Sequence, residues 1–146
     1  MMITPMGGAS AARSRYNTDA VLSASPVRLL TMLYDRLLLD LGRAEAAQME
    51  ENWSIASENL LHAQAIVAEL SSSLKVDLWD GGEGLMAIYA YVSNALISAN
   101  VHRDVARTRE SIALLEPLRA TWHEAADQLA QATPPVVPAG RELGFA

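Results

Sequence analysis

Three histidines are the residues of this 146-residue chain best suited to metal binding or proton transfer. His62 follows Glu58 by four residues, whereas di-iron sites in helical bundles use Glu-x-x-His pairs at a spacing of three, together with further inward glutamates. His102 lies at an expected turn, and the neighbours His123 and Glu124 point to different faces of a helix. None of these patterns supplies a metal-ligand set, so we predict structural histidines and no metal site.

A phosphotransfer role for His62 is the strongest enzymatic alternative, because an exposed histidine on a helical bundle resembles such a site. The residues after it, Ala63-Gln64-Ala65-Ile66, offer no basic side chain to stabilise a phosphate. No Gly-x-Ser-x-Gly nucleophile elbow occurs, and Gly81-Gly82-Glu83-Gly84 lacks the Lys-Ser/Thr of a phosphate-binding loop. We therefore predict no catalytic residue, no cofactor and no enzyme, and a helix-to-helix turn at the glycines.

Composition and charge exclude further classes of protein. The formal net charge is -6, from 17 acidic and 11 basic residues without a dense Lys/Arg cluster, which excludes a nucleic-acid footprint. With no cysteine, disulfides and thiol-based metal sites are also excluded. The segment Met1 to Arg15 lacks the apolar core of a signal peptide, and no window of about 18 uninterrupted apolar residues occurs. We expect a cytoplasmic protein without membrane insertion.

The elements that carry the remaining side chains are predicted to be helices. Hydrophobic residues make up 51% of the chain but aromatic residues only 5%, a mixture based on Ala and Leu that favours helix packing. Apolar periodicity predicts helices at about 26–50, 53–74 and 83–101, and a fourth from an Asp104 cap to 132. Short connections favour an antiparallel up-down four-helix bundle, so the predicted class is all-α.

Domain limits follow from the ends of this pattern. We expect a flexible N-terminus at 1–15, one bundle domain at 16–132 that opens with an N-terminal arm or short helix, and a disordered Pro/Gly-rich tail at 133–146. Pro117 falls inside the fourth helix, where it removes a hydrogen bond and clashes with the carbonyl of Ala113, so we predict a kink or break near Leu115-Glu116.

The first helix begins at a sharp signal and is unusually apolar. Ser25 can cap the helix, and Pro26 occupies the first-turn position where its missing N–H has no consequence. The apolar residues that follow cover more of the circumference than a core requires, and Leu38 and Leu39 lie off the inward row, so at least one should be exposed. An exposed apolar patch of this kind marks a binding surface or a dimer interface.

Several motifs occur in the order that is typical of one family. They are Tyr16, Ala24-Ser25-Pro26, Met32-Leu33-Tyr34-Asp35, Glu69-Leu70 with Ser72-Ser73-Leu74, Gly81-Gly82, Tyr89-x-Tyr91, Ala99-Asn100 with Asp104, and Leu118-Arg119 with Trp122. Together they resemble the FliS family of flagellar secretion chaperones from about Tyr16 to Ala126. The family tends to have an acidic residue where this chain has Arg28, which places a positive charge at the unfavourable end of the helix dipole.

The resemblance implies a cytoplasmic chaperone that binds the C-terminal segment of flagellin, prevents its premature polymerisation and supports its export by the flagellar type III secretion apparatus. It implies the flagellar export gate as a second partner, and a free state that is a monomer or weak homodimer. The alternative is a homodimeric helical adaptor that uses the same surface without an export client.

Client-binding residues transfer from the resemblance only at matched positions. They are Tyr16, Leu22, Met32, Tyr34, Leu38, Tyr89, Tyr91 and Leu96. Tyr16 and Leu22 are expected to cover the apolar groove in the free protein and to shift when the client arrives. Tyr89 and Tyr91 are about 200° apart on a helix, so both cannot face one core and one is available to a partner.

Overall fold

Four helices make up almost all of the described chain. The computed structural model describes residues 25–76 and 80–132, which form α2 (Pro26–Met49), α3 (Trp53–Ser73), α4 (Gly82–Val101) and α5 (Val105–Ala132), and no strand occurs in these ranges. The helix boundaries agree with those predicted from periodicity to within one residue. The all-α class is therefore confirmed.

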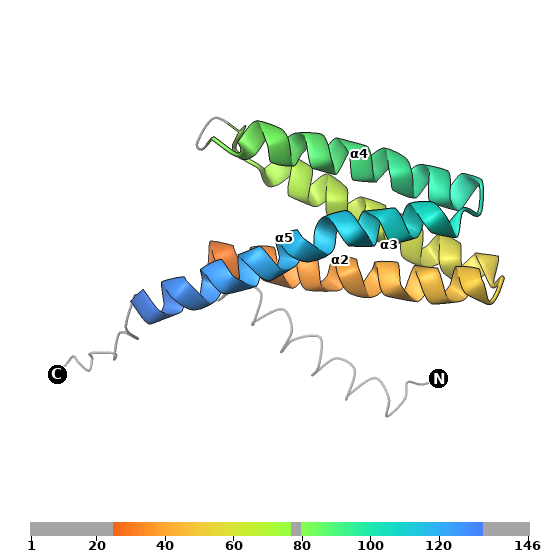
Figure 1. The fold of residues 1–146 in the computed structure, drawn as a ribbon, viewed down its shortest axis with the longest axis horizontal. Coiled ribbons are helices and arrows are strands. Elements are labelled where there is room, and N and C mark those ends of the chain that lie inside the picture. Colours follow the sequence, from red (N-terminus) through yellow and green to blue (C-terminus); the bar gives the residue numbers. More distant parts are fainter. Residues whose placement is uncertain (1–24, 77–79, 133–146) are drawn as a thin grey trace, which may run out of the picture.

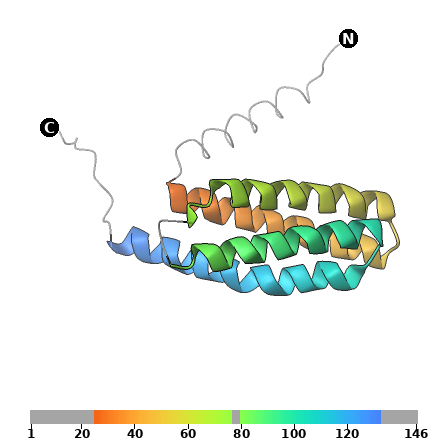
Figure 2. The ribbon, with the colours of Figure 1, turned by 90° about the horizontal axis from the view of Figure 1, so that it is seen from above.

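The helices form one antiparallel up-down bundle, as predicted. Each helix packs on two neighbours in the cyclic order α2, α3, α4, α5, and α5 returns to contact α2. Figures 1 and 2 show the four rods running roughly along one long axis, with the α2–α3 and α4–α5 turns at the same end. The opposite end holds the start of α2, the end of α3 and the start of α4.

Polar caps define where the helices begin. The Ser25 side chain accepts a hydrogen bond from the backbone N–H of Arg28 (3.2 Å), and Pro26 stands at the first helical position. The Asn52 side chain accepts from the N–H of Ile55 (3.3 Å), and Asp104 Oδ1 accepts from the N–H of Ala106 (3.0 Å). These bonds satisfy donors that the first turn leaves unpaired, so the predicted starts have a physical cause.

The α2–α3 and α4–α5 turns share one geometry. The end of the bundle that holds them is called the closed end. Glu51 (φ 58°) follows α2, and Arg103 (φ 53°) follows α4, each in the left-handed region. In both turns the next N–H reaches back to a helix carbonyl, from Asn52 to Ala47 (2.8 Å) and from Asp104 to Ala99 (3.0 Å). This six-to-one bond is the Schellman pattern, which ends a helix and reverses the chain within a few residues.

The core runs the length of the bundle and draws on all four helices. Its fully buried large side chains include Leu37 and Leu41 of α2, Leu60 of α3, Leu96 of α4 and Leu115 of α5. A second part of the core is polar and lies near the closed end of the bundle.

This polar part joins three helices through Gln48. Its amide nitrogen donates to the carbonyl of Ala99 (3.3 Å), and its amide oxygen accepts from the hydroxyl of Thr108 (2.7 Å). Gln48 is 4% exposed and Thr108 is fully buried. Since buried polar groups are costly without partners, these bonds fix the register of α2, α4 and α5.

Pro117 does not break α5, which is one helix from Val105 to Ala132. Of the kink or break predicted near Leu115-Glu116, the break is therefore wrong, and the kink stays a prediction. Both views show the α5 ribbon curving along its length (Figures 1 and 2). Packing of Leu115 in the core and of Trp122 against it holds both halves of the helix on the bundle, which offsets the local cost of proline.

Close approach explains the glycine at the start of α4. A Cβ atom on Gly82 would lie 2.7 Å from the carbonyl oxygen of Val76, whereas one on Gly84 would meet nothing within 4 Å. The glycine group therefore serves as a helix connection, as predicted, and one of its members is required sterically.

Three further expectations fall outside the described residues. Tyr16 and Leu22, the N-terminal arm, and the proposed tail at 133–146 all lie there. Within the described residues one helix, α4, is long and apolar enough to cross a membrane by length and composition, with a mean hydropathy of 1.2. Because α4 supplies seven buried residues to the bundle, its apolar character is also that of a core helix.

Candidate functional site

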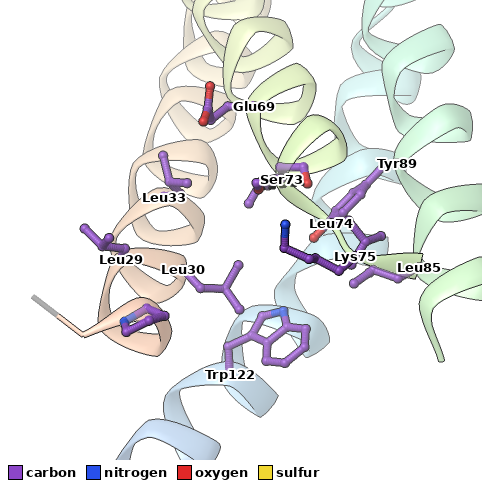
Figure 3. A pocket seen from close by; sticks show the side chains of 12 residues that line it. Leu29, Leu30, Leu33, Glu69, Ser73, Leu74, Lys75, Leu85, Tyr89 and Trp122 are labelled. Atoms are coloured by element: carbon purple, nitrogen blue, oxygen red, sulfur yellow. Dashed lines mark hydrogen bonds between the residues drawn. The ribbon is translucent and has the colours of Figure 1, made fainter. Parts of the chain in front are cut away.

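An apolar groove of about 570 Å³ lies at the end of the bundle where α2 begins and α3 ends, which is called the open end. Figure 3 shows side chains from all four helices converging on it. Its lining consists of Pro26, Leu29, Leu30, Leu33, Glu69, Leu70, Ser73, Leu74, Lys75, Leu85, Tyr89 and Trp122. The wide apolar lining makes the groove suited to apolar side chains of another polypeptide.

The groove exists because the apolar rows of the helices continue past the part of the bundle that can cover them. Leu30 and Leu33 belong to the inward row of α2, and Leu74 ends the inward row of α3, yet all three are only half-buried. Farther along the same rows, Leu37 and Leu60 are completely buried. The row ends therefore form a wall that faces solvent.

Tyr89 and Trp122 line the inner side of the groove, and Tyr34 contacts both of them from behind. The hydroxyl oxygens of Tyr34 and Tyr89 lie 2.7 Å apart and share a hydrogen bond. The Trp122 ring centroid is 6.4 Å from that of Tyr34, with the two ring planes tilted by 56°. Burial raises the pKa of both tyrosines above the ordinary value, because it penalises the charged phenolate. The cluster is a neutral, fixed backing for the groove.

Charged groups stand only at the rim. Glu69 and Lys75 are both exposed and belong to the lining, near the end of α3. Figure 3 shows the Lys75 ammonium at the mouth beside Leu74, with Glu69 one to two turns away along α3. A groove with an apolar interior and a polar rim resembles the anatomy of a protein–protein interface.

A motif of α2 and a motif of α5 meet next to this groove. Asp35 Oδ1 accepts hydrogen bonds from Arg119 Nε (2.7 Å) and from His123 Nε2 (2.7 Å). One residue earlier, Tyr34 contacts Trp122. The Met32–Asp35 motif of α2 thus binds the Leu118–Trp122 motif of α5, which positions Trp122 at the groove.

The structure places the predicted client-binding residues in three different environments. Met32 and Leu38 are half-buried on α2, and Tyr91 is 44% exposed, so these three can contact a partner. Tyr34, Tyr89 and Leu96 are buried, with at most 1% exposure, so they offer a partner little surface in this structure, and their role in client binding stays a prediction. Of these three only Tyr89 belongs to the groove lining.

The direction of the inner seam explains this burial. Tyr89 and Leu96 fall in the same register as Leu85 and Val92, which face the core. Tyr34 lies one turn before Leu37 and Leu38, and its hydroxyl shares a hydrogen bond with that of Tyr89. The geometric expectation for the tyrosine pair is confirmed, since Tyr89 is buried and Tyr91 is exposed, and so is the exposure of Leu39 at 46%.

Sequence reasoning missed the leucines that line the groove from the row ends. Leu29, Leu30, Leu33 and Leu74 lie within the predicted helices, but none of them is among the predicted client-binding residues. Their positions could have indicated this role, because each lies within two turns of a helix end at the open end of the bundle. This inference requires knowing which helix ends lie together in the fold.

Two of the three histidines, His62 and His123, hydrogen-bond to carboxylates of α2. His62, with a side chain 51% exposed, hydrogen-bonds to the buried carboxylate of Asp40, which also accepts from Arg36 Nε (3.0 Å). His123 pairs with Asp35. Among residues 25–76 and 80–132 no group of three or more His, Cys, Asp or Glu side chains could hold a metal ion.

Comparison with known proteins gives a consistent result. A family model described as "Flagellar protein FliS" matches residues 8–129. The Flagellar secretion chaperone FliS of Escherichia coli (strain K12) is 32% identical over 111 residues, which cover 73% of this chain and 79% of that protein. The protein of the same name from Bacillus subtilis (strain 168) is 28% identical over 110 residues, covering 75% and 82%.

A solved structure described as "Crystal structure of flagellar chaperone from bacteria" has the same fold. The TM-score is 0.65, and the match covers 82% of this chain and 98% of that one. At 19% sequence identity, this likeness bears on the fold alone.

Proposed function

The chain belongs to the FliS family of flagellar secretion chaperones, and from that membership we propose that it binds the C-terminal segment of flagellin through the groove at the open end of its bundle. A chaperone role in flagellar export follows from the family itself. The identity of the client, the segment bound and the site are the proposal. The observation that carries it is the apolar groove, which the fold leaves uncovered at the ends of its inward rows.

The chemistry of the groove supports binding of an amphipathic segment. Leu29, Leu33 and Leu74 offer half-buried apolar surface, which gains about 25 cal/mol for each Å² removed from water. A client segment that is disordered when free loses chain entropy on binding, so it needs an extended apolar contact of this kind. No chemical step is required.

The cluster behind the groove supports the same proposal. Because Tyr34, Tyr89 and Trp122 are held by hydrogen bonds and ring contacts, the inner wall does not have to reorganise when a client arrives. A preorganised wall lowers the entropy cost of binding. Glu69 and Lys75 at the rim are placed to orient polar groups of the client.

In this proposal the segment before Pro26 covers the groove in the free protein. Pro26 belongs to the groove lining, and Tyr16 and Leu22 precede it by ten and four residues. Ten residues of chain span enough distance for Tyr16 to reach the groove. In this proposal the client displaces Tyr16 and Leu22, and Met32, Leu38 and Tyr91 extend the contact beyond the groove.

The biological consequence is control of assembly. Flagellin whose C-terminal segment is bound in the cytoplasm cannot add to a filament before export. The complex is then delivered to the export gate of the flagellar type III secretion apparatus, where the client is released.

Capture of flagellin tests this proposal directly. Full-length flagellin of the host is expected to co-purify with the chain at one to one, whereas flagellin without its last ~40 residues, a length sufficient for two helices, is not. Equal capture of the two flagellins would contradict binding through the C-terminal segment.

A pair of matched variants tests the groove. Leu29→Asp introduces a charge into the lining without removing a core contact, and we expect flagellin affinity to fall by about tenfold or more. Leu114→Asp makes the same change on α5, at a leucine 38% exposed and outside the lining, and should leave affinity unchanged. Circular dichroism of both variants checks that the helices persist. Unchanged capture by a folded Leu29→Asp variant would remove the groove from the proposal.

A further inference from the structure

A second cavity, of about 250 Å³, lies at the closed end of the bundle. Unlike the groove, it is lined by several polar side chains, from Gln48 near the end of α2, Ser57 near the start of α3, Asn100 near the end of α4 and Arg103 in the α4–α5 turn. The cavity and the groove share no lining residue. A ligand of this cavity would therefore differ in chemistry from the proposed client segment and would not compete with it.

The charge of the cavity comes from Arg103, the one charged residue among the described residues that line it. The acidic residues of the adjacent turns, Glu51 and Asp104, are not part of the lining. Asp104 Oδ1 instead accepts the backbone N–H of Ala106 at the start of α5 (3.0 Å). The cavity thus has a positive charge that no carboxylate of its lining neutralises.

The Arg103 guanidinium is held in place by a contact that uses none of its N–H donors. Its central carbon lies over the Trp53 ring, 5.0 Å from the ring centroid, which is a cation–π distance. Arg107 and Arg109 each form an ion pair with a glutamate, whereas Arg103 forms no ion pair or side-chain hydrogen bond with any residue of 25–76 and 80–132. The planar fork of N–H donors is therefore available to a ligand.

Gln48 adds a buried donor to the lining. The carbonyl oxygen of Ala99 can only accept a hydrogen bond, so the amide nitrogen of Gln48 must face it, and the amide oxygen accepts from Thr108. An amide nitrogen carries two hydrogens, and the one not bonded to Ala99 has no partner in the part of the chain that the structure describes. Gln48 is 4% exposed, so its orientation is fixed by packing as well as by these bonds.

Ser57 and Asn100 bring two more donors that the fold does not use. Both side chains are partly buried, and neither forms a side-chain hydrogen bond with another described residue. Together with Arg103 and Gln48 they place an excess of donors around one cavity. Since donors shielded from water are costly without acceptors, the lining favours a ligand rich in acceptor oxygens and negative in charge.

We propose that the cavity at the closed end binds a carboxylate group. Arg103 holds the two carboxylate oxygens with paired N–H donors, and Ser57, Asn100 and the second amide hydrogen of Gln48 donate to the ligand. A carboxylate carries one negative charge, which one arginine balances, whereas a phosphate dianion would remain partly unneutralised in a chain whose formal net charge is -6. A volume of 250 Å³ equals that of about eight water molecules, so a small organic acid fits, and so does the acidic side chain of another protein.

Titration with butyrate, followed by nuclear magnetic resonance of the ¹⁵N-labelled full chain, tests this proposal. Gln48, Trp53 and Asn100 each carry a side-chain N–H in the lining, and their signals should shift and saturate at constant ionic strength. Butyramide has the same shape without the charge, and its dissociation constant should be at least about tenfold higher. Equal affinity for butyramide, or the absence of saturable shifts with butyrate, would overturn the proposal. Tighter binding of inorganic phosphate than of butyrate would also overturn it.

Matched arginine variants locate the site. Arg103→Gln should raise the dissociation constant for butyrate by about tenfold or more, whereas Arg43→Gln, an exposed change on α2 outside the lining, should not alter it. Ser57→Ala keeps the charge and should raise the constant by about threefold, which tests the site without altering the α4–α5 turn. The unshifted signals of each spectrum check the fold. Equal losses in Arg103→Gln and Arg43→Gln would mean general attraction of anions and would refute a site.

A second probe distinguishes the two sources of the carboxylate. Glutamate blocked at both ends, as N-acetylglutamate N-methylamide, represents an acidic side chain within a polypeptide, and butyrate represents a free acid. Both should compete for the cavity, and the tighter of the two assigns the site to a partner protein or to a small molecule. Failure of both to shift the Gln48 and Asn100 signals would refute the site, and flagellin capture through the groove would be unaffected because the linings are separate.

Discussion

At the scale of single residues, the Tyr34–Tyr89–Trp122 cluster shows how a polar group is kept in an apolar wall. The Tyr34 and Tyr89 hydroxyls are hydrogen-bonded to each other. Tyr34→Phe and Tyr89→Phe each leave one buried hydroxyl without this partner. We expect each variant to lose about 1–3 kcal/mol in the free energy of unfolding, measured in urea. Variants as stable as the unmodified chain would show that the shared hydrogen bond contributes nothing.

The same pair predicts the alkaline behaviour of the protein. The pKa of each phenol is raised in the folded state, whereas in the unfolded chain it is about 10. Above pH 10 the unfolded state releases protons that the folded state retains, so stability is complete below that pH and falls as the pH rises further. Urea midpoints between pH 8 and 11 should decline above 10, and the decline should be smaller in the Tyr34→Phe/Tyr89→Phe double variant. An identical decline in both proteins would place its cause elsewhere.

Gly82 and Gly84 form a natural pair of test and control. Gly82→Ala forces the Cβ atom against the backbone of Val76 and should lower the free energy of unfolding by about 1–3 kcal/mol. Gly84→Ala meets no atom and should raise it by about 1 kcal/mol through helix propensity. Thermal or urea unfolding measures both. A stabilising Gly82→Ala would show that the α3–α4 connection yields to the methyl group.

At the scale of elements, α5 shows how packing overrides a local signal. Pro117 cannot donate a backbone hydrogen bond, yet the helix continues for fifteen further residues to Ala132. Beyond the proline, Arg119 and His123 bind Asp35 of α2, and Trp122 packs on the core. These contacts hold the second half of α5 in place although the sequence disfavours it.

Replacing the proline should therefore stabilise the helix. Pro117→Ala is expected to raise the free energy of unfolding by about 2 kcal/mol, because a propensity difference of about 3 kcal/mol is partly offset by greater entropy of the unfolded chain. Glu124→Ala, an exposed change on the same helix, is the control and should alter stability little. A loss of stability in Pro117→Ala would mean that the curvature of α5 is needed for its contact with α2.

At the scale of the whole molecule, one core joins the four helices, so the bundle should unfold as a unit. Trp53 lies by the closed end and Trp122 at the groove, so each tryptophan reports on one end. Two variants would each retain one of these tryptophans, with the other and Trp79 replaced by Phe. In each variant the urea midpoint measured by tryptophan fluorescence should coincide with the midpoint measured by circular dichroism. Leu96→Ala, at a fully buried site, should lower all of them together by about 2–5 kcal/mol in free energy. Separate midpoints would show that the groove end melts independently.

The sequence by itself determined the helices and their order. Caps at Ser25 and Asp104, together with apolar periodicity, are local signals, and local signals fix helix boundaries because helix hydrogen bonds join residues four apart. The motifs also sufficed to indicate the family. Exposure of Tyr91 against burial of Tyr89 followed from helical geometry alone.

Tertiary structure decided which apolar residues remain uncovered. Leu30 and Leu37 have the same type and lie in the same row of α2, yet the first lines the groove and the second is fully buried. The difference depends on whether α3, α4 and α5 extend far enough to cover each position, a relation between residues distant in the chain. For the same reason Tyr34 and Leu96 lie in the core, Pro117 lies within a helix, and the candidate site lies at the open end of the bundle.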